Sequence, residues 1–169
     1  HRVTPGKPAE LVCNTIGANG TTFDLQGNVI VCEGDARRIS RLRADNTLEP
    51  ICERYQGGRF ARPNDIICRT DGSLYFTDPD KRVPYGKREI PGEAGINNLW
   101  DGAGVFRLAT DGTVSMVANC EYPNGLAFSP DERTLYVANT RSSKYIHAID
   151  LDANGNMLRR RIFADMNAG

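Results

Sequence analysis

An internal repeat constrains the fold of this chain more than any other feature. Three stretches begin with Asn and then run through a short apolar segment, a turn and a second apolar segment, at residues 19–31, 64–76 and 124–137. Their starts are 64 − 19 = 45 and 124 − 64 = 60 residues apart. A further pair of strand-like runs follows each stretch, for example residues 39–43 with 48–53. Four strands in roughly 40–50 residues are typical of a β-propeller blade.

The remaining periodicity also favours strands. Short β-branched or aromatic runs at residues 28–32, 73–77, 105–108, 114–117, 134–138 and 145–149 are separated by Gly, Asp, Asn and Pro. No long stripe with the period of a helix occurs, so we predict an all-β fold class. The longer second interval indicates an insertion at about residues 79–103, which we interpret as a loop over one face of the disc.

The repeats predict one partial propeller domain over residues 1–169. We expect a stub of an earlier blade at residues 1–13, and blades at about 17–55, 62–119 and 122–164. A closed propeller needs at least four blades and commonly has six to eight. The first residue is His1 and not Met. We therefore expect the remaining blades to come from missing flanking sequence or from another chain.

Composition argues against several classes of partner. The 21 basic and 21 acidic residues give a net charge of zero, so we expect neither nucleic acid nor a membrane as partner. No apolar run approaches the roughly 20 residues of a bilayer span. The five cysteines form no Cys-x-x-Cys pair, and buried thiols are the simplest interpretation. A soluble protein of a reducing, cytoplasmic compartment fits this pattern better than a periplasmic one.

Several motifs resemble one known family. They are Arg-Pro-Asn-Asp-Ile at residues 62–66, Asp-Gly-Ser-Leu-Tyr-Phe-Thr-Asp-Pro at 71–79, and Pro-Asn-Gly-Leu-Ala-Phe-Ser-Pro-Asp at 123–131. Together they resemble the gluconolactonase/SMP-30 (regucalcin)-like family, and residues 18–27 and 32–38 are similar to its bacterial gluconolactonase branch. The resemblance implies a six-bladed β-propeller with a divalent cation at the mouth of its central channel. Ca²⁺ is the expected ion, with Zn²⁺, Mn²⁺ or Mg²⁺ as alternatives, and the implied reaction is hydrolysis of sugar lactones or related esters.

The repeat gives a physical reason to consider its opening residues. Rotation would place Asn19, Asn64 and Asn124 on a ring around the propeller axis, where amide oxygens could hold a hard cation. The alternative is that each Asn only serves turn geometry. The resemblance implies that Asn64 and Asn124 are metal ligands and that Asn64 also contacts substrate. Asn19 has no support beyond symmetry, and we interpret it as structural.

The resemblance also implies a substrate contact for Arg62, through sugar hydroxyls or the product carboxylate; a solvated surface Arg is the alternative. Asp65 would either orient Asn64 or form a turn, and Asp78 would be a turn residue of the blade. Tyr85 and Trp100 lie in the insertion, where they could cover a sugar ring or simply pack within the loop.

Neutral amide ligands would leave a cation Lewis-acidic towards a lactone carbonyl, so no serine nucleophile is required. None is indicated, because no Gly-x-Ser-x-Gly motif occurs and the only histidines are His1 and His147. The acidic motifs that the family adds, Glu-Gly-Pro and Pro-Asp-Gly, are absent, and Glu33 closes a second strand instead of opening a first. We therefore expect the catalytic Asp to lie beyond residue 169 and this piece to be inactive alone.

Two alternatives to a lactonase stay open. The first is a metal-dependent phosphotriester or aryl-ester hydrolase, which would use the same cation with a different pocket lining. The second is a non-catalytic propeller that serves as a binding module, in which the asparagines are turn residues only.

Overall fold

The computed structural model describes residues 1–79, 103–141 and 143–167, and every regular element in these ranges is a β-strand. Most of the strands form three four-stranded antiparallel sheets. The first sheet has the order β1-β2-β3-β4, with β1 (Ala18–Phe23), β2 (Val29–Glu33), β3 (Arg38–Leu42) and β4 (Leu48–Cys52). The all-β fold class predicted from the repeat is confirmed.

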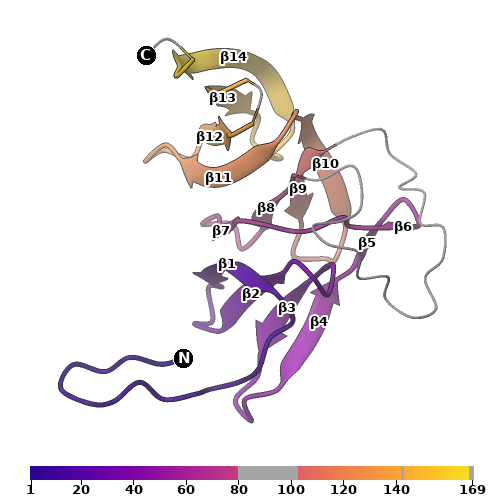
Figure 1. Cartoon of the computed structure of the whole chain (residues 1–169). Coiled ribbons are helices and arrows are strands. Elements are labelled where there is room, and N and C mark those ends of the chain that lie inside the picture. The colour runs from indigo at the N-terminus through magenta and orange to yellow at the C-terminus, as the bar shows by residue number, and fades with distance from the viewer. Residues whose placement is uncertain (80–102, 142, 168–169) are drawn as a thin grey trace.

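The second sheet has the order β7-β8-β9-β10, with β7 (Ile66–Cys68), β8 (Leu74–Asp78), β9 (Gly104–Leu108) and β10 (Val114–Asn119). The third sheet has the order β11-β12-β13-β14, with β11 (Pro123–Phe128), β12 (Thr134–Asn139), β13 (Tyr145–Leu151) and β14 (Met157–Asp165). A short hairpin of β5 (Arg54–Tyr55) and β6 (Gly58–Arg59) links the first two sheets. The sheets follow one another in chain order like consecutive propeller blades (Figure 1).

The tight turns explain why each repeat folds back after its first strand. Asp24 and Asp71 each accept the backbone N–H two residues ahead, at 3.0 and 2.9 Å. Gly27 and Gly72 then adopt φ of +82° and +85°, a region that an L side chain rarely occupies. In the third repeat Asp131 makes the same kind of bond, but Glu132 stands at the left-handed position with φ of 54°.

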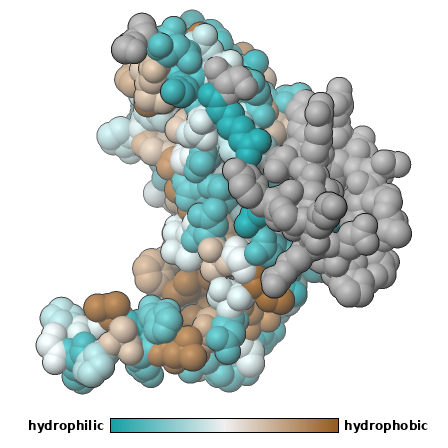
Figure 2. All heavy atoms as spheres, viewed as in Figure 1, coloured by the Kyte–Doolittle hydropathy of each residue, from teal (hydrophilic) through white to brown (hydrophobic). Residues whose placement is uncertain are grey.

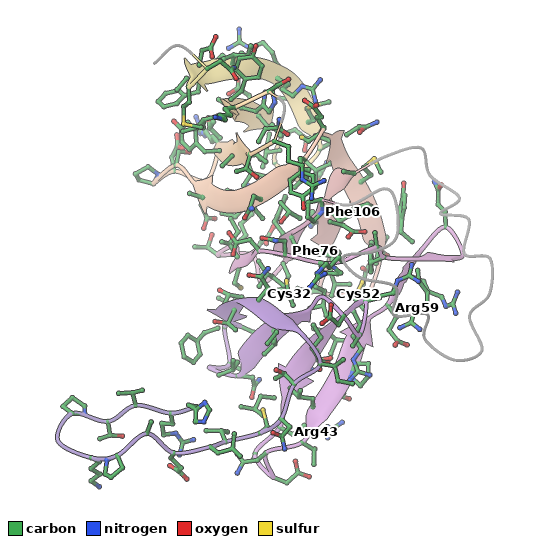
Figure 3. The ribbon with its side chains drawn as sticks, in the orientation of Figure 1. Cys32, Arg43, Cys52, Arg59, Phe76 and Phe106 are labelled. Carbon is green, nitrogen blue, oxygen red and sulfur yellow. The ribbon has the colours of Figure 1, made fainter. Side chains whose placement is uncertain are left out.

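Two apolar layers hold the three sheets together. Between the first and second sheets lie the buried side chains of Ile30, Cys32, Ile39, Cys52, Phe60, Ile66, Phe76 and Phe106. Figure 3 shows Cys32 and Cys52 on the first sheet, on the side nearer the labelled Phe76 and Phe106 of the second sheet. Between the second and third sheets lie Tyr75, Val105, Leu135, Val137 and Ile149. Burial of these apolar surfaces is the main force that fixes the sheets face to face.

The N-terminal segment lies outside the three sheets. Residues 1–11 are exposed, and a single antiparallel bridge joins Arg2 to Glu10. Several exposed apolar residues, Val3, Leu11, Phe23 and Leu25, belong to this segment and to the first sheet, and apolar surface is seen at that end of the molecule in Figure 2. Other exposed apolar side chains lie on β14. The predicted insertion, with Tyr85 and Trp100, falls almost wholly outside the described residues. No helix in the described ranges is long and apolar enough to cross a membrane.

Candidate functional site

The first strands of the three sheets, β1, β7 and β11, lie next to one another in space. β1 contacts β7, and β11 contacts both β7 and β8. The backbone N–H of Gly20 donates to the carbonyl oxygen of Asn64 at 2.7 Å, which joins the first repeat to the second. The repeat thus places its opening residues around one region, as rotational symmetry predicts.

Thr77, at the second-last position of β8, joins the second repeat to the third. Its side chain is fully buried, and its carbonyl oxygen accepts the backbone N–H of Asn64 at 2.9 Å. Its hydroxyl donates to the carbonyl oxygen of Asn124 at 2.9 Å and accepts the backbone N–H of Asp65 at 3.1 Å. Asn64 and Asn124 are therefore both anchored to the same residue.

Asp65 makes a second connection between the same two repeats. Its Oδ1 accepts the N–H of Ile66 at 2.9 Å, and its Oδ2 accepts the N–H of Leu126 on β11 at 2.8 Å. Both carboxylate oxygens are thus engaged with backbone groups. The structure gives Asp65 a structural role at the junction of the sheets.

The side-chain oxygens of the two anchored asparagines remain available. Asn64 and Asn124 are both half-buried. Nδ2 of Asn124 donates weakly to the hydroxyl of Thr140 at 3.4 Å, and within the described residues no hydrogen bond engages either Oδ1. The side-chain amide oxygens of two asparagines whose backbones are bonded to the same buried residue can serve as neutral ligands or as acceptors for sugar hydroxyls.

The side-chain oxygens of Asn64 and Asn124 can be compared with the ligands that the divalent cation implied by the family resemblance requires. Amide oxygens are ligands that a hard divalent cation accepts. Among residues 1–79, 103–141 and 143–167, no three His, Cys, Asp or Glu side chains come together in a group that could hold a metal ion. The nearby Asp65 is already bonded to backbone N–H groups. The amide oxygens of the two asparagines therefore fit a cation as neutral ligands, and Asp65, whose two oxygens are bonded to backbone N–H groups, is held as part of the structure.

The last residue of the second strand plays the same role in all three sheets, which sequence reasoning did not anticipate. Glu33, Asp78 and Asn139 are all buried. Each side chain accepts the backbone N–H of a residue that leads into the first strand of its own sheet. Glu33 binds Ile16 at 3.1 Å, Asp78 binds Ala61 and Arg62 at 2.7 and 2.6 Å, and Asn139 binds Tyr122 at 2.6 Å. The sequence does contain a signal for this role. In each repeat the second apolar run ends with an acidic or amide residue.

This arrangement differs from the turn role predicted for Asp78, which lies inside β8. Glu33 also accepts hydrogen bonds from Nε of Arg38 at 2.7 Å and from the hydroxyl of Ser40 at 2.6 Å. Burial raises the pKa of the Glu33 carboxyl, but these hydrogen bonds outweigh burial, so its pKa lies below the ordinary value. The carboxylate is held as part of the structure.

Arg62 lies at the junction of the first and second sheets. One guanidinium nitrogen is 2.9 Å from Oδ1 of Asp35, and both side chains are about two-fifths exposed. A Cβ added to Gly34 would lie 3.0 Å from Cγ of Arg62, so the glycine leaves room for the arginine stem. The guanidinium is therefore oriented by Asp35 and remains accessible to solvent.

His147 does not join this region. It lies on β13, the third strand of its sheet, and burial lowers its pKa. Its Nδ1 is buried and has no hydrogen-bond partner among the described residues. This environment is that of a histidine packed within its sheet. It does not support a role for His147 as a general base.

Comparison with known proteins adds to this geometry. The model of a family described as the SMP-30/Gluconolactonase/LRE-like region matches residues 1–169. A gluconolactonase of Zymomonas mobilis is 37% identical over 142 residues, which cover 82% of this chain and 38% of that protein. A solved gluconolactonase of Xanthomonas campestris superposes with a TM-score of 0.80 at 36% identity, over 95% of this chain and 53% of that one.

A more distant solved structure, virginiamycin B lyase of Staphylococcus aureus, has a TM-score of 0.60 at 15% identity and shows likeness of fold alone. The chain spans 38% of the length of the curated relative and 53% of the Xanthomonas structure. The three sheets thus correspond to about half of a gluconolactonase fold.

Proposed function

Because the chain belongs to the SMP-30/gluconolactonase/LRE-like family, we propose that the protein hydrolyses sugar lactones, as a carboxylic ester hydrolase of the gluconolactonase type. Its 36–37% identity to two gluconolactonases supports this substrate class. The structural observation that carries the proposal is the shared anchoring of Asn64 and Asn124 on Thr77. It ties the backbones of two half-buried asparagines from different repeats to one buried residue.

We further propose that Asn64 and Asn124 hold a divalent cation, most simply Ca²⁺, at the mouth of the propeller channel. A cation bound there would polarise the lactone carbonyl and stabilise negative charge on its oxygen. The neutral amides would bind the ion without cancelling its charge. The charged ligands and the general base would come from residues outside the described ranges.

The chain's own residues then bind and orient the sugar. Asn64 can donate a hydrogen bond from its amide nitrogen to a sugar hydroxyl. The side chain of Arg62, two residues earlier, ends in a guanidinium and is about two-fifths exposed as a whole. Such a group can bind hydroxyl oxygens of the substrate or the carboxylate that forms on ring opening.

Lactone hydrolysis releases acid, so a pH indicator with δ-gluconolactone as substrate gives the direct test. With the remaining blades present, we expect the completed propeller to give a rate above the spontaneous background that falls at least tenfold in Asn124→Ala. The exposed turn variant Asn154→Ala is the matched control and is expected to keep the wild-type rate. An Asn124→Ala rate equal to wild type would remove Asn124 from the site.

The cation is tested separately from the activity. After treatment with EDTA, Ca²⁺, Zn²⁺, Mn²⁺ or Mg²⁺ is added to the protein and the melting temperature is followed. A ligand that binds only the folded state raises that temperature by mass action, and we expect this rise to disappear in Asn124→Ala. Absence of a shift with every metal at millimolar concentration contradicts the cation proposal.

Substrate panels decide between the remaining alternatives. Hydrolysis of aryl esters or phosphotriesters, without hydrolysis of γ- or δ-lactones, would point to the other hydrolase class. Absence of any hydrolysis, together with absence of a metal response, would favour the binding module.

A further inference from the structure

Thr77 has an unusual set of partners for a buried strand residue. Among the residues that the structure describes, its hydroxyl is bonded only to backbone groups, the carbonyl of Asn124 and the N–H of Asp65, which belong to different repeats. Its own carbonyl binds the N–H of Asn64. One fully buried residue therefore touches the backbone of both candidate ligands.

Comparison of the three repeats shows that the fold of a single blade does not require a hydroxyl at the position of Thr77. Thr77 precedes Asp78, the buried acceptor at the end of β8. The residues that precede the matching acceptors in the first and third sheets are Cys32 and Ala138, and neither carries a hydroxyl. The hydroxyl is thus specific to the sheet that carries Asn64 and faces Asn124.

We infer that Thr77 is a positioning residue that fixes the placement of Asn64 relative to Asn124. Its carbonyl holds the first asparagine, its hydroxyl holds the second, and the two bonds come from one rigid strand residue. Asp65 braces the same junction through the N–H of Leu126. The consequence for cation binding rests on the proposed function, whereas the positioning itself does not.

The physical reason is the cost of leaving buried backbone groups unpaired. Without the hydroxyl, the carbonyl of Asn124 loses a donor and the N–H of Asp65 loses its acceptor. Buried groups of this kind are stabilised strongly by a partner, so β11 is expected to shift until water or another group reaches them. Asn124 would move with β11, and its placement relative to Asn64 would change.

The experiment compares Thr77→Ala, Thr77→Ser and the wild type. Alanine is chosen because the third sheet already carries it at the matching position, and serine restores the hydroxyl. Thr134→Ala is the matched control, since Thr134 on β12 uses its hydroxyl on the side chain of Asp150 and not on a candidate ligand. Near-ultraviolet circular dichroism first establishes that each variant is folded.

The first readout is amide hydrogen exchange at Leu126, a group that Thr77 does not touch. Its N–H is bonded to Asp65, so it reports whether the whole junction loosens. We expect faster exchange in Thr77→Ala and wild-type exchange in both Thr77→Ser and Thr134→Ala. Unchanged exchange at Leu126 in Thr77→Ala overturns the inference.

The second readout is the affinity for Ca²⁺, measured by calorimetry. Loss of a residue that orients metal ligands typically costs 10–100-fold in affinity, and we expect roughly a tenfold loss in Thr77→Ala that Thr77→Ser restores. Wild-type affinity in Thr77→Ala would also overturn the inference. Where the wild type binds no cation, the cation proposal fails and the exchange at Leu126 alone decides the positioning role.

Asp65→Asn, which removes one acceptor of the same junction, is the second variant if Thr77→Ala does not fold.

Discussion

The carboxylate of Asp65 accepts the backbone N–H of Leu126 at 2.8 Å, although 61 residues separate them in the sequence. This bond ties the second sheet to the first strand of the third. Much of the contact between the sheets is through apolar faces, which resist separation but allow sliding. A directed bond between a carboxylate and a partly buried backbone N–H fixes the register of two sheets in a way that apolar contact does not.

Gly20 and Gly125 occupy the same position in their repeats, directly after Asn19 and Asn124, yet they should respond oppositely to alanine. A Cβ on Gly20 would lie 2.6 Å from Cα of Asp65 and 2.7 Å from the carbonyl oxygen of Asn64, both of them backbone atoms. A Cβ on Gly125 would meet only the carboxylate of Asp65, at 3.9 Å. Neither residue has a left-handed φ.

We therefore expect Gly20→Ala to lower the free energy of unfolding by about 1–3 kcal/mol, as overpacking does. Gly125→Ala should stay within about 0.5 kcal/mol of the wild type. Urea denaturation followed by circular dichroism measures both. Equal losses in the two variants would mean that the first and second sheets do not approach as closely as the structure shows.

The repeat was sufficient to predict much of the fold, because turn residues and apolar alternation are local signals. The run at residues 73–77 became β8 (Leu74–Asp78), and the run at 134–138 became β12 (Thr134–Asn139). The proximity of Asn64 and Asn124 followed from symmetry alone. The hydrogen bonds that hold the two asparagines could not be predicted in this way, because the hydroxyl of Thr77 binds the carbonyl oxygen of Asn124, 47 residues later in the sequence.

Local sequence patterns gave wrong predictions where a side chain forms hydrogen bonds with a segment many residues away. Asp78 resembles a turn residue because Pro79 follows it, but its carboxylate binds the N–H groups of Ala61 and Arg62. Asn64 was expected to open a strand, yet β7 begins at Ile66. In the first case the partners lie 16 and 17 residues earlier, where the chain leads into β7, and a local sequence window does not contain the information needed to find them.

Glu132 connects the turns of the second and third sheets at the end opposite the candidate site on β7 and β8. Its carboxylate accepts the N–H of Thr70 at 3.1 and 3.2 Å and the hydroxyl of Thr70 at 2.5 Å, and it lies 3.6 Å from Nε of Arg69. Loss of these bonds in Glu132→Ala should lower the free energy of unfolding by about 1–2 kcal/mol.

Glu49→Ala provides the comparison for that variant. Glu49 pairs with Arg43, which lies at the periphery of the first sheet in Figure 3, at 2.5 Å, and Arg43 is more than half exposed. An exposed ion pair contributes at most about 1 kcal/mol, so its loss should be small and should diminish further in salt. Urea denaturation at low and high salt measures both variants. A larger loss for Glu49→Ala than for Glu132→Ala would contradict the assigned role of Glu132.

The cysteines should differ in reactivity because burial differs among them. Burial raises the pKa of the Cys52 thiol to about 12 and also raises the pKa values of Cys32 and Cys120. The thiolate is the reactive form, so these three should resist iodoacetamide at about pH 8 in the native protein. Cys13, half-buried in the N-terminal segment, should be labelled first.

Mass spectrometry of peptides from native and urea-treated protein identifies the labelled positions. All five cysteines should react in urea, which serves as the control for intrinsic reactivity. Rapid labelling of Cys52 in the native protein would show that the apolar layer between the first and second sheets opens far more often than its packing indicates.

The buried carboxylate of Glu33 predicts how stability depends on pH. Hydrogen bonds from Arg38, Ser40 and Ile16 hold its pKa below the ordinary 4.5 despite burial. A carboxyl whose pKa is lower in the folded state than in the unfolded state stabilises the fold above the unfolded value, and this contribution is lost as the pH falls through the folded value. Glu33→Gln should therefore be less stable than wild type by about 1–3 kcal/mol near neutral pH.

The difference between wild type and Glu33→Gln should shrink steadily as the pH is lowered from about 5 towards 3, because protonation removes the charge from the wild-type side chain. Urea denaturation at a series of pH values measures it. Ser40→Ala removes one of the donors that hold the folded-state pKa down, so in this variant the pH-dependent loss of stability should be smaller and should be complete at a higher pH than in wild type. A difference that stays constant from pH 7 to about pH 3 would show that Glu33 acts through its shape and not through its charge.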